Sequence, residues 1–192
     1  MQKVLVTGGL GYIGSHTVVE LQNAGFKVVI IDNLSNSSLE VLDGIIEITG
    51  KTPLFEKIDL RQKSEVIQFF EKYQDISGII HFAASKAVGE SVENPLLYYE
   101  NNLSTLIYLL QACNNYTIEN FIFSSSCTVY GEPDKLPIDE SAPIKKATSP
   151  YGNTKQISEE ILNDSCKVSN LKSIALRYFN PIGAHDSSKI GE

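Results

Sequence analysis

The sequence predicts an α/β protein: a doubly wound parallel sheet with helices on both faces, giving a three-layer α/β/α architecture. First, short apolar runs alternate with longer stretches of helical periodicity, which is typical of βαβ units. Second, most of these runs are continuously apolar, as expected for strands covered on both faces. Third, a glycine-rich turn follows the first run directly. A length of 192 residues fits one domain spanning residues 1–192.

The expected strands and helices alternate along the whole chain. Strands are predicted over residues 3–7, 27–32, 54–59, 78–83, 120–125 and 173–177. Helices are predicted over residues 12–24, 39–49, 63–73, 95–116 and 150–168. The connection 126–148 is long, polar and contains proline. Because a structureless stretch of that length in a compact domain is usually functional, we expect it to serve a site.

Composition and charge exclude several classes of function. A net charge of −7 argues against a broad footprint on nucleic acid or on an anionic membrane. Three cysteines without a C-x-x-C pattern indicate neither a disulfide framework nor a zinc site, and three scattered histidines predict no metal centre. No apolar run approaches the length of a membrane span and no signal-peptide pattern opens the sequence. We therefore expect a cytoplasmic protein.

The first predicted strand runs into TGGLGYIGSH, where Gly8, Gly11 and Gly14 lie three residues apart. Glycine allows a tight turn, close approach of the backbone to a pyrophosphate, and close packing of helix on strand. The helix that begins near Tyr12 would direct its first N–H groups at the anion. Such a turn can also be purely structural. Its place between a strand and a helix, with an acid ending the second strand, favours nucleotide binding in a Rossmann fold.

That acid is Asp32, which lies 24 residues after Gly8. A carboxylate here can accept hydrogen bonds from the adenosine ribose and repel a 2′-phosphate. No arginine or lysine lies between Asp32 and Lys51, so the sequence favours NAD over NADP. The alternative for Asp32 is a cap for the following loop. Asp59, at the expected end of the third strand, is equally consistent with an adenine contact and with a turn cap.

The segment SPYGNTK combines a helix start with a reactive pair. Ser149 suits the N-cap and Pro150 the first helical position. Tyr151 and Lys155 then lie one turn apart on one face. Chance alone predicts about 0.7 Tyr-x-x-x-Lys matches in this chain, so the spacing by itself proves nothing. In context, an ammonium and a positively charged nicotinamide ring would both lower the tyrosine pKa toward the working range of a base.

Three serines, Ser124 to Ser126, lie at the carboxyl end of the fifth predicted strand, in FIFSSSCTVYG. In open parallel sheets ligands bind at the carboxyl ends of the strands, so one of these hydroxyls could bond the same substrate oxygen as Tyr151. The alternative is that the serines only serve turn chemistry.

Together these motifs resemble the extended short-chain dehydrogenase/reductases, which combine Gly-x-x-Gly-x-x-Gly with Tyr-x-x-x-Lys. The similarity is closer still to the UDP-glucose (UDP-galactose) 4-epimerase branch of that family. It rests on VTGGLGYIGSHT, DNLSNS, KAVGESVENPLLYYENN, FIFSSSCTVYG, SPYGNTK and LRYFNPIGAH, which span positions 4 to 185.

The resemblance implies a role for each matching residue. Tyr151 would be the catalytic base, Lys155 would lower its pKa and bind the nicotinamide ribose, and Ser126 would be the hydroxyl partner. Besides the three glycines, Tyr151 and Lys155, cofactor contacts are implied for Tyr12, Ile13, Asp32, Asn33, Leu34, Ser35, Asn36, Ser37, Asp59, Leu60, Phe82, Ala83, Ala84, Lys86, Asn101 and Phe179. Lys86 and Asn180 would contact the sugar nucleotide.

The reaction implied by the resemblance interconverts UDP-galactose and UDP-glucose with tightly bound NAD. Tyr151 would take the proton of the sugar 4-hydroxyl while hydride passes to NAD⁺, and hydride would return to the other face of the 4-keto sugar. Related 4,6-dehydratases carry an acid just after the strand-end hydroxyl. Here the sequence reads Ser126-Cys127-Thr128, which disfavours elimination because that step needs an acid and a base. Another NAD-dependent sugar-nucleotide epimerase or dehydrogenase stays open.

Two departures from the resembled epimerases affect the expectations. Ala84-Ser85 stands where they usually have Gly-Leu, which concerns local cofactor packing. The resemblance also implies that the C-terminal substrate domain is absent from this chain. We therefore expect NAD binding with weak or no epimerisation by the chain alone, and a non-catalytic NAD-binding fragment or module is the alternative.

The predicted helix 95–116 is rich in leucine, isoleucine and tyrosine. A sheet-facing stripe explains part of this composition. The apolar set is wide enough for a second buried face. The resemblance implies a homodimer formed through this helix and the helix 150–168.

Overall fold

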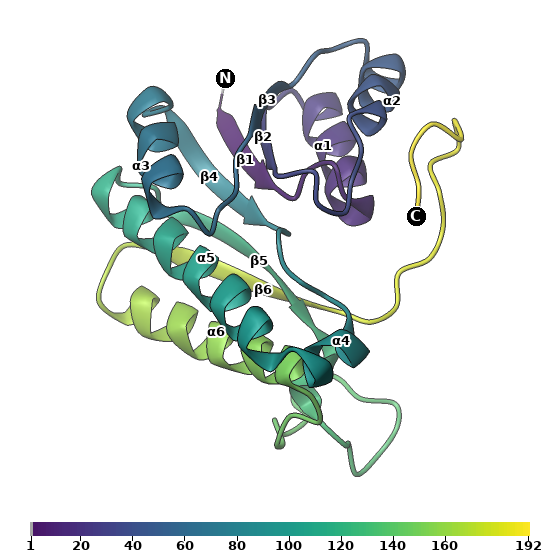
Figure 1. Ribbon diagram of the computed structural model, residues 1–192, viewed down its shortest axis with the longest axis vertical. Coiled ribbons are helices and arrows are strands. Elements are labelled where there is room, and N and C mark those ends of the chain that lie inside the picture. The colour runs from purple at the N-terminus through teal and green to yellow at the C-terminus, as the bar shows by residue number, and fades with distance from the viewer. Residues whose placement is uncertain (1) are drawn as a thin grey trace.

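The computed structural model describes residues 2–192 and contains a six-stranded parallel sheet between two layers of helices (Figure 1). The strand order is β3-β2-β1-β4-β5-β6, and the sheet is doubly wound and parallel as the sequence predicted. In chain order the elements are β1 (Lys3–Thr7), α1 (Tyr12–Asn23), β2 (Lys27–Asp32), α2 (Glu40–Thr49), β3 (Leu54–Lys57), α3 (Lys63–Lys72), β4 (Ile76–His81), α4 (Val88–Glu93), α5 (Pro95–Asn115), β5 (Asn120–Ser126), η1 (Cys127–Tyr130), α6 (Pro150–Lys167) and β6 (Lys172–Tyr178).

Each expected strand and helix is present, with ends shifted by at most two residues. The third strand is shorter than expected because its only partner, β2, ends at Asp32, which pairs with Lys57. Asp59 therefore lies beyond the strand. The short helix α4 and the 3₁₀ turn η1 were not predicted. Because η1 opens the connection 126–148, the expectation of a structureless stretch was wrong at its start.

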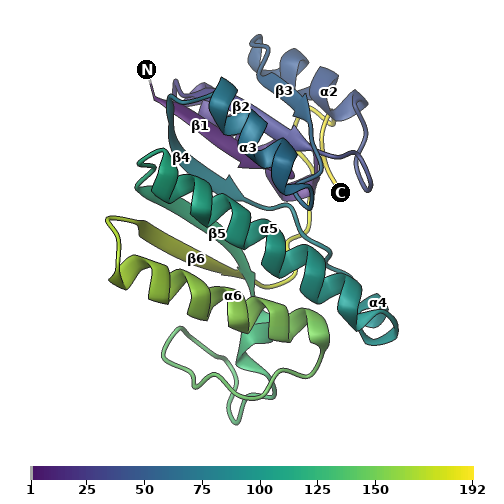
Figure 2. The ribbon, with the colours of Figure 1, turned by 60° about the vertical axis from the view of Figure 1, so that its left-hand side comes forward.

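Two hydrophobic clusters hold the layers to the sheet. Successive residues of β1 point to opposite faces, so Leu5 joins one cluster and Val6 the other. Helices α3, α5 and α6 cover the first face and lie in a row in Figure 2. Helices α1 and α2 cover the second face over β1 and β2. The nearly continuous apolarity of these strands thus follows from coverage on both sides.

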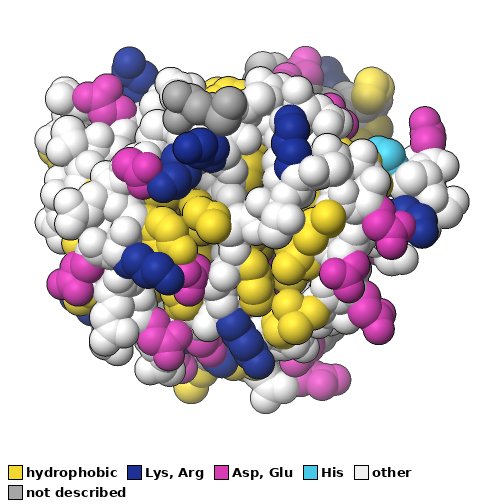
Figure 3. Space-filling model, turned by 90° about the horizontal axis from the view of Figure 1, so that it is seen from above, with side chains coloured by type: hydrophobic (Ala, Val, Ile, Leu, Met, Phe, Trp, Pro, Cys, Tyr) yellow, Lys and Arg dark blue, Asp and Glu magenta, His cyan; other side chains and the backbone are white. Residues whose placement is uncertain are grey.

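Strand β6 departs from this pattern. It pairs only with β5 and ends the sheet, and its side chains Ile174 and Leu176 are 60% and 39% exposed. For β6 the expectation of a strand covered on both faces was wrong, because α1 and α2 do not extend over it (Figure 1). Hydrophobic side chains also reach the surface in the middle of the face shown in Figure 3. Within residues 2–192, none of the helices is both long and apolar enough to cross a membrane.

Candidate active site

The turn between β1 and α1 leaves no room for side chains at two of its glycines. Gly8 has φ of +66°, and a Cβ there would lie 2.8 Å from the Ala83 backbone nitrogen. A Cβ on Gly14 would lie 2.1 Å from the Gly8 carbonyl oxygen. Gly11 is the N-cap of α1 and supplies no capping side chain. The first N–H groups of α1 are thus open to an anion, as expected for a phosphate-binding turn.

The Asp32 carboxylate organises the loops around this turn. It accepts hydrogen bonds from the backbone nitrogen of Leu10 at 3.1 Å, from that of Leu34 at 3.0 Å and from the Ser37 hydroxyl at 2.8 Å. These bonds confirm the loop-capping alternative. They also hold Leu34 at φ of +61°, a conformation that is costly for a branched side chain. A carboxylate has about four acceptor directions, so one is left for a ligand.

Asp59 is likewise engaged as a turn cap. Its carboxylate accepts from the Arg61 backbone nitrogen at 3.0 Å and forms an ion pair with the Arg61 guanidinium at 2.6 Å. The hydrogen bond from Arg61 lowers the pKa of Asp59, although partial burial opposes the change. The Asn33 side chain also lowers the pKa of this carboxyl group, and the ends of β2 and β3 lie side by side because Asp32 pairs with Lys57. Leu60 beside it is buried.

The residues after β4 adjoin the glycine turn, because Ala83 contacts Gly8. The departure at Ala84-Ser85 has a local explanation. The Asn101 amide donates to the Ser85 hydroxyl at 2.8 Å, and the Ser85 backbone nitrogen donates to Asn102 Oδ1 at 2.9 Å. Ser85 thus fastens the loop after β4 to α5.

Helix α6 begins as the sequence predicted. Ser149 is the N-cap and accepts from the Gly152 backbone nitrogen at 3.1 Å, with Pro150 in the first turn. Tyr151 and Lys155 share one face of the helix. The Lys155 Nζ lies 5.7 Å from the centroid of the Tyr151 ring, and Lys155 is 3% exposed.

Burial controls the protonation of this pair. It lowers the pKa of Lys155 to about 8. Burial also raises the pKa of Tyr151, while the Ser126 hydroxyl as a hydrogen-bond partner lowers it. The net effect keeps the phenol protonated at neutral pH, so a further positive charge beside it is needed to make Tyr151 a base.

Ser126 ends β5 and begins η1. Its hydroxyl oxygen accepts from the Thr128 backbone nitrogen at 3.2 Å and from the Thr128 hydroxyl at 3.0 Å. The turn chemistry proposed as an alternative for the serines is therefore present. It leaves the Ser126 proton free to be donated elsewhere, because a hydroxyl can accept and donate at once.

Phe179 and Asn180 directly follow β6, whose last residue, Tyr178, pairs with Ser126 at the carboxyl edge of the sheet. Both are exposed, Phe179 by 57%. The segment after β6 runs back to α1 and α2 (Figure 1). Ile190 anchors it in the second hydrophobic cluster, and Gly44 of α2 leaves space for the Lys189 carbonyl. Lys86, the other predicted substrate contact, is also exposed.

Sequence reasoning missed a buried histidine. The Nδ1 atom of His81 lies 2.7 Å from the Thr7 hydroxyl, which joins the ends of β4 and β1. Burial, with the nearby charge of Lys155, lowers the pKa of His81 to about 3, so the imidazole is neutral. Its position at the carboxyl end of an apolar strand was the available signal. Throughout residues 2–192, no three His, Cys, Asp or Glu side chains are grouped so as to hold a metal ion.

The pattern of the NAD dependent epimerase/dehydratase family matches residues 4–191. The chain belongs to this family. Among its curated relatives, the UDP-glucose 4-epimerase of Bacillus subtilis is 52% identical over 190 residues, which cover 98% of this chain and 56% of the relative. The UDP-glucose 4-epimerase of Mus musculus is 47% identical over 199 residues, which cover 100% of this chain and 57% of the relative. The chain thus spans just over half the length of these family members.

Solved epimerase structures of the family share the fold. The UDP-glucose 4-epimerase of Bifidobacterium longum in complex with NAD⁺ and UDP superposes with a TM-score of 0.96 at 44% identity, covering 100% of this chain and 57% of that chain. The enzyme from Stenotrophomonas maltophila with bound NAD and formylated UDP-arabinopyranose gives a TM-score of 0.94 at 45% identity, covering 100% and 57%. The resemblance to the epimerases is confirmed.

Proposed function

We propose that this chain is the NAD-binding part of a UDP-glucose 4-epimerase, which interconverts UDP-galactose and UDP-glucose by transient oxidation at C4. The observation that carries the proposal is the convergence of Ser126, Tyr151 and Lys155 at the carboxyl edge of the sheet that also bears the glycine turn. The relatives with NAD and UDP-sugars in their structures support it. Absence of a carboxylate at 126–128 continues to disfavour a dehydratase.

The chain's backbone fits the cofactor. A side chain at Gly8 or Gly14 would fill the turn, so the sequence keeps the backbone there accessible to a pyrophosphate. Asp32 and Asn33 would hold the adenosine, and Lys155 the nicotinamide ribose. When bound, NAD supplies an acceptor and then a donor of hydride.

Side chains of this chain transfer the proton of the sugar 4-hydroxyl. Tyr151 accepts the proton of the sugar 4-hydroxyl and returns it after inversion. The Lys155 ammonium stabilises the phenolate, since it is fixed close to the ring. Ser126 donates a hydrogen bond to the same sugar oxygen. Lys86 and Asn180 are the proposed contacts to the sugar nucleotide.

Residues 1–192 are proposed to form the cofactor domain, with weak turnover when separate from the further length that the relatives have. A cytoplasmic location belongs to the same proposal, because Cys113, Cys127 and Cys166 are all free thiols. The alternative is a non-catalytic NAD-binding module.

Helices α5 and α6 are the proposed homodimer surface. They pack together and are joined by a 2.7 Å hydrogen bond from the Asn153 amide to the Tyr99 hydroxyl. Apolar side chains remain on the outer side of α5, where Leu97 and Ile107 are each 38% exposed. Burial of this stripe against a second copy would add hydrophobic stabilisation.

The test of function is conversion of UDP-galactose to UDP-glucose by the purified chain with NAD⁺, beside Tyr151→Phe. Slow conversion that Tyr151→Phe abolishes supports a catalytic domain. NAD binding without any conversion, at every protein concentration, favours the module. Robust conversion would contradict our expectation that the chain is weak alone.

A further inference from the structure

Two turns of α6 are tied to two consecutive residues of β5 by hydrogen bonds. The Lys155 Nζ donates to the Ser124 carbonyl oxygen at 2.7 Å, and the Ser125 hydroxyl donates to the Glu159 carboxylate. Tyr151 lies one turn before Lys155, and burial raises its pKa while the Ser126 hydroxyl, as its hydrogen-bond partner, lowers it. Because residues four apart lie on one face of a helix, positions 151, 155 and 159 all face the carboxyl end of β5.

Glu159 does more than bond Ser125. Its carboxylate accepts two bonds from the Arg177 guanidinium of β6, at 3.0 Å from Nε and 2.7 Å in the ion pair. The side chains of Glu159 and Arg177 are 14% and 20% exposed. The bond to Glu159 raises the pKa of Arg177 above its ordinary range. One carboxylate therefore joins α6, β5 and β6, and charge-assisted bidentate bonds of this kind are strong.

Arg177 in turn holds the turn that follows Ser126. Its guanidinium carbon lies 4.8 Å from the centroid of the Tyr130 ring. Tyr130 is buried in η1, the same turn in which Thr128 bonds the Ser126 hydroxyl. The chain is thus held on both sides of Ser126, directly through Ser125 and indirectly through Arg177.

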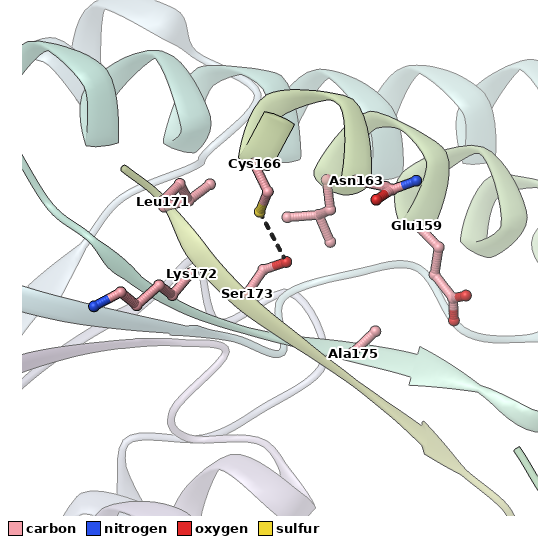
Figure 4. Close-up of a pocket in the computed structure, with 8 residues that line it drawn as sticks. Glu159, Asn163, Cys166, Leu171, Lys172, Ser173 and Ala175 are labelled. Carbon is pink, nitrogen blue, oxygen red and sulfur yellow. Dashed lines mark hydrogen bonds between the residues drawn. The ribbon is translucent and has the colours of Figure 1, made fainter. Parts of the chain in front are cut away.

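We propose that Glu159 is a positioning residue that keeps the Ser126 hydroxyl against the Tyr151 phenol. The proposal rests on the proposed function for its chemical meaning, but its geometry stands apart from the cofactor. Glu159 does not reach the reacting groups. Figure 4 shows it extending from α6 toward β6, at the rim of a cavity of about 360 Å³ that Cys166, Ser173 and Ala175 also line.

Two possible roles of Glu159 predict opposite changes in the pKa of Tyr151 when Glu159 is removed. If Glu159 positions Ser126, its loss weakens the hydrogen bond that favours the phenolate, and the pKa of Tyr151 rises. If Glu159 acts only as a negative charge, its removal favours the phenolate and the pKa falls. A residue that only stabilises the fold leaves this pKa unchanged.

The experiment is an NMR titration of Tyr151 in the free 192-residue chain, with ¹³Cζ-labelled tyrosine and Tyr151→Phe to assign the signal. Glu159→Ala should raise the phenol pKa by roughly half to one unit, which is what one hydrogen bond contributes. Glu159→Gln, which keeps an acceptor for Ser125, should raise it less. Glu160→Gln, the adjacent exposed acid, is the matched control and should not change it.

An unchanged or lowered pKa in folded Glu159→Ala would overturn the proposal. If Glu159→Ala does not fold, Ser125→Ala is measured instead, because it removes one hydrogen bond and leaves the Glu159–Arg177 ion pair. A higher pKa of Tyr151 in Ser125→Ala supports the proposal, and an unchanged or lower pKa overturns it. The titration contains no NAD or sugar nucleotide. Failure of the proposed function would appear separately, as absence of NAD binding.

Discussion

The Lys155 Nζ donates a 2.7 Å hydrogen bond to the main-chain carbonyl of Ser124, and this contact places a buried cation between strand β5 and the Tyr151 ring. No carboxylate bonds this ammonium among the residues that the structure describes. A desolvated cation without an ion pair is costly, which is why the pKa of Lys155 falls to about 8. Buried Lys155 thus lowers the stability of the folded chain, while it places a positive charge beside the Tyr151 phenol.

The first prediction separates these two effects with Lys155→Met. Removal of the buried cation should raise the free energy of unfolding at pH 7 by about 1–3 kcal/mol, while the pKa of Tyr151 rises. The gain should shrink between pH 8 and 10.5, because the unfolded lysine still binds its proton there while the folded one has lost it. Urea unfolding at several pH values and a phenol titration measure both.

The matched control is Lys167→Met, which removes an exposed lysine from the same helix. It should change the free energy of unfolding by less than about 0.5 kcal/mol and should leave the pKa of Tyr151 unchanged. Destabilisation by Lys155→Met would show that the Ser124 bond outweighs the burial of charge.

The second prediction concerns acid stability. His81 is neutral in the folded chain with a pKa of about 3, whereas the unfolded chain binds a proton near pH 6.5. Its contribution to stability is therefore present above pH 6.5 and is lost as the pH falls toward 3, by up to roughly 1.4 kcal/mol per pH unit. His81→Asn should flatten the unfolding free energy over this range, relative to the natural chain.

His16→Asn tests whether this slope belongs to His81, because His16 is half-buried on α1 and not enclosed by the sheet. That variant should keep the acid slope of the natural chain. Equal slopes in the natural chain and His81→Asn would contradict the assignment.

The third prediction uses the glycine turn. Gly14→Ala places a Cβ 2.1 Å from the Gly8 carbonyl, so the turn must open. NAD binding should be lost, with destabilisation of about 1–3 kcal/mol. Gly89→Ala is the control, since a Cβ on Gly89 in α4 meets nothing within 4 Å. It should bind NAD normally, and normal binding by Gly14→Ala would remove the turn from the site.

Local chemistry explains what the sequence could predict. Apolar periodicity placed every strand and the five long helices, and the Ser149 cap with Pro150 marked the start of α6. Both signals act within a few residues, so they can be read from one segment.

Long-range pairing explains what it could not predict. Thr7 and His81 meet across 74 positions, and Glu159 of α6 accepts a hydrogen bond from Ser125 of β5. Such partners become neighbours only when the sheet has formed. The exposure of Ile174 likewise depends on what packs over β6, which the apolar run does not encode.

The fourth prediction tests the proposed dimer surface. Ile107→Asp places a charge in the exposed stripe of α5, so this variant should sediment as a monomer, whereas we expect the unaltered chain to sediment as a dimer. Ile182→Asp is the control, because Ile182 is 87% exposed on the segment after β6. A natural chain that is monomeric at all concentrations would contradict the dimer.

The site geometry predicts that the carboxyl edge of this sheet binds NAD and that Asp32 selects against a 2′-phosphate. Titration calorimetry of the 192-residue chain with NAD⁺ and with NADP⁺ measures both properties. We predict one saturable NAD⁺ site per chain and at least about tenfold weaker binding of NADP⁺. Absence of NAD⁺ binding would show that this edge is not a cofactor site, and equal affinity for the two nucleotides would show that Asp32 does not select against the 2′-phosphate.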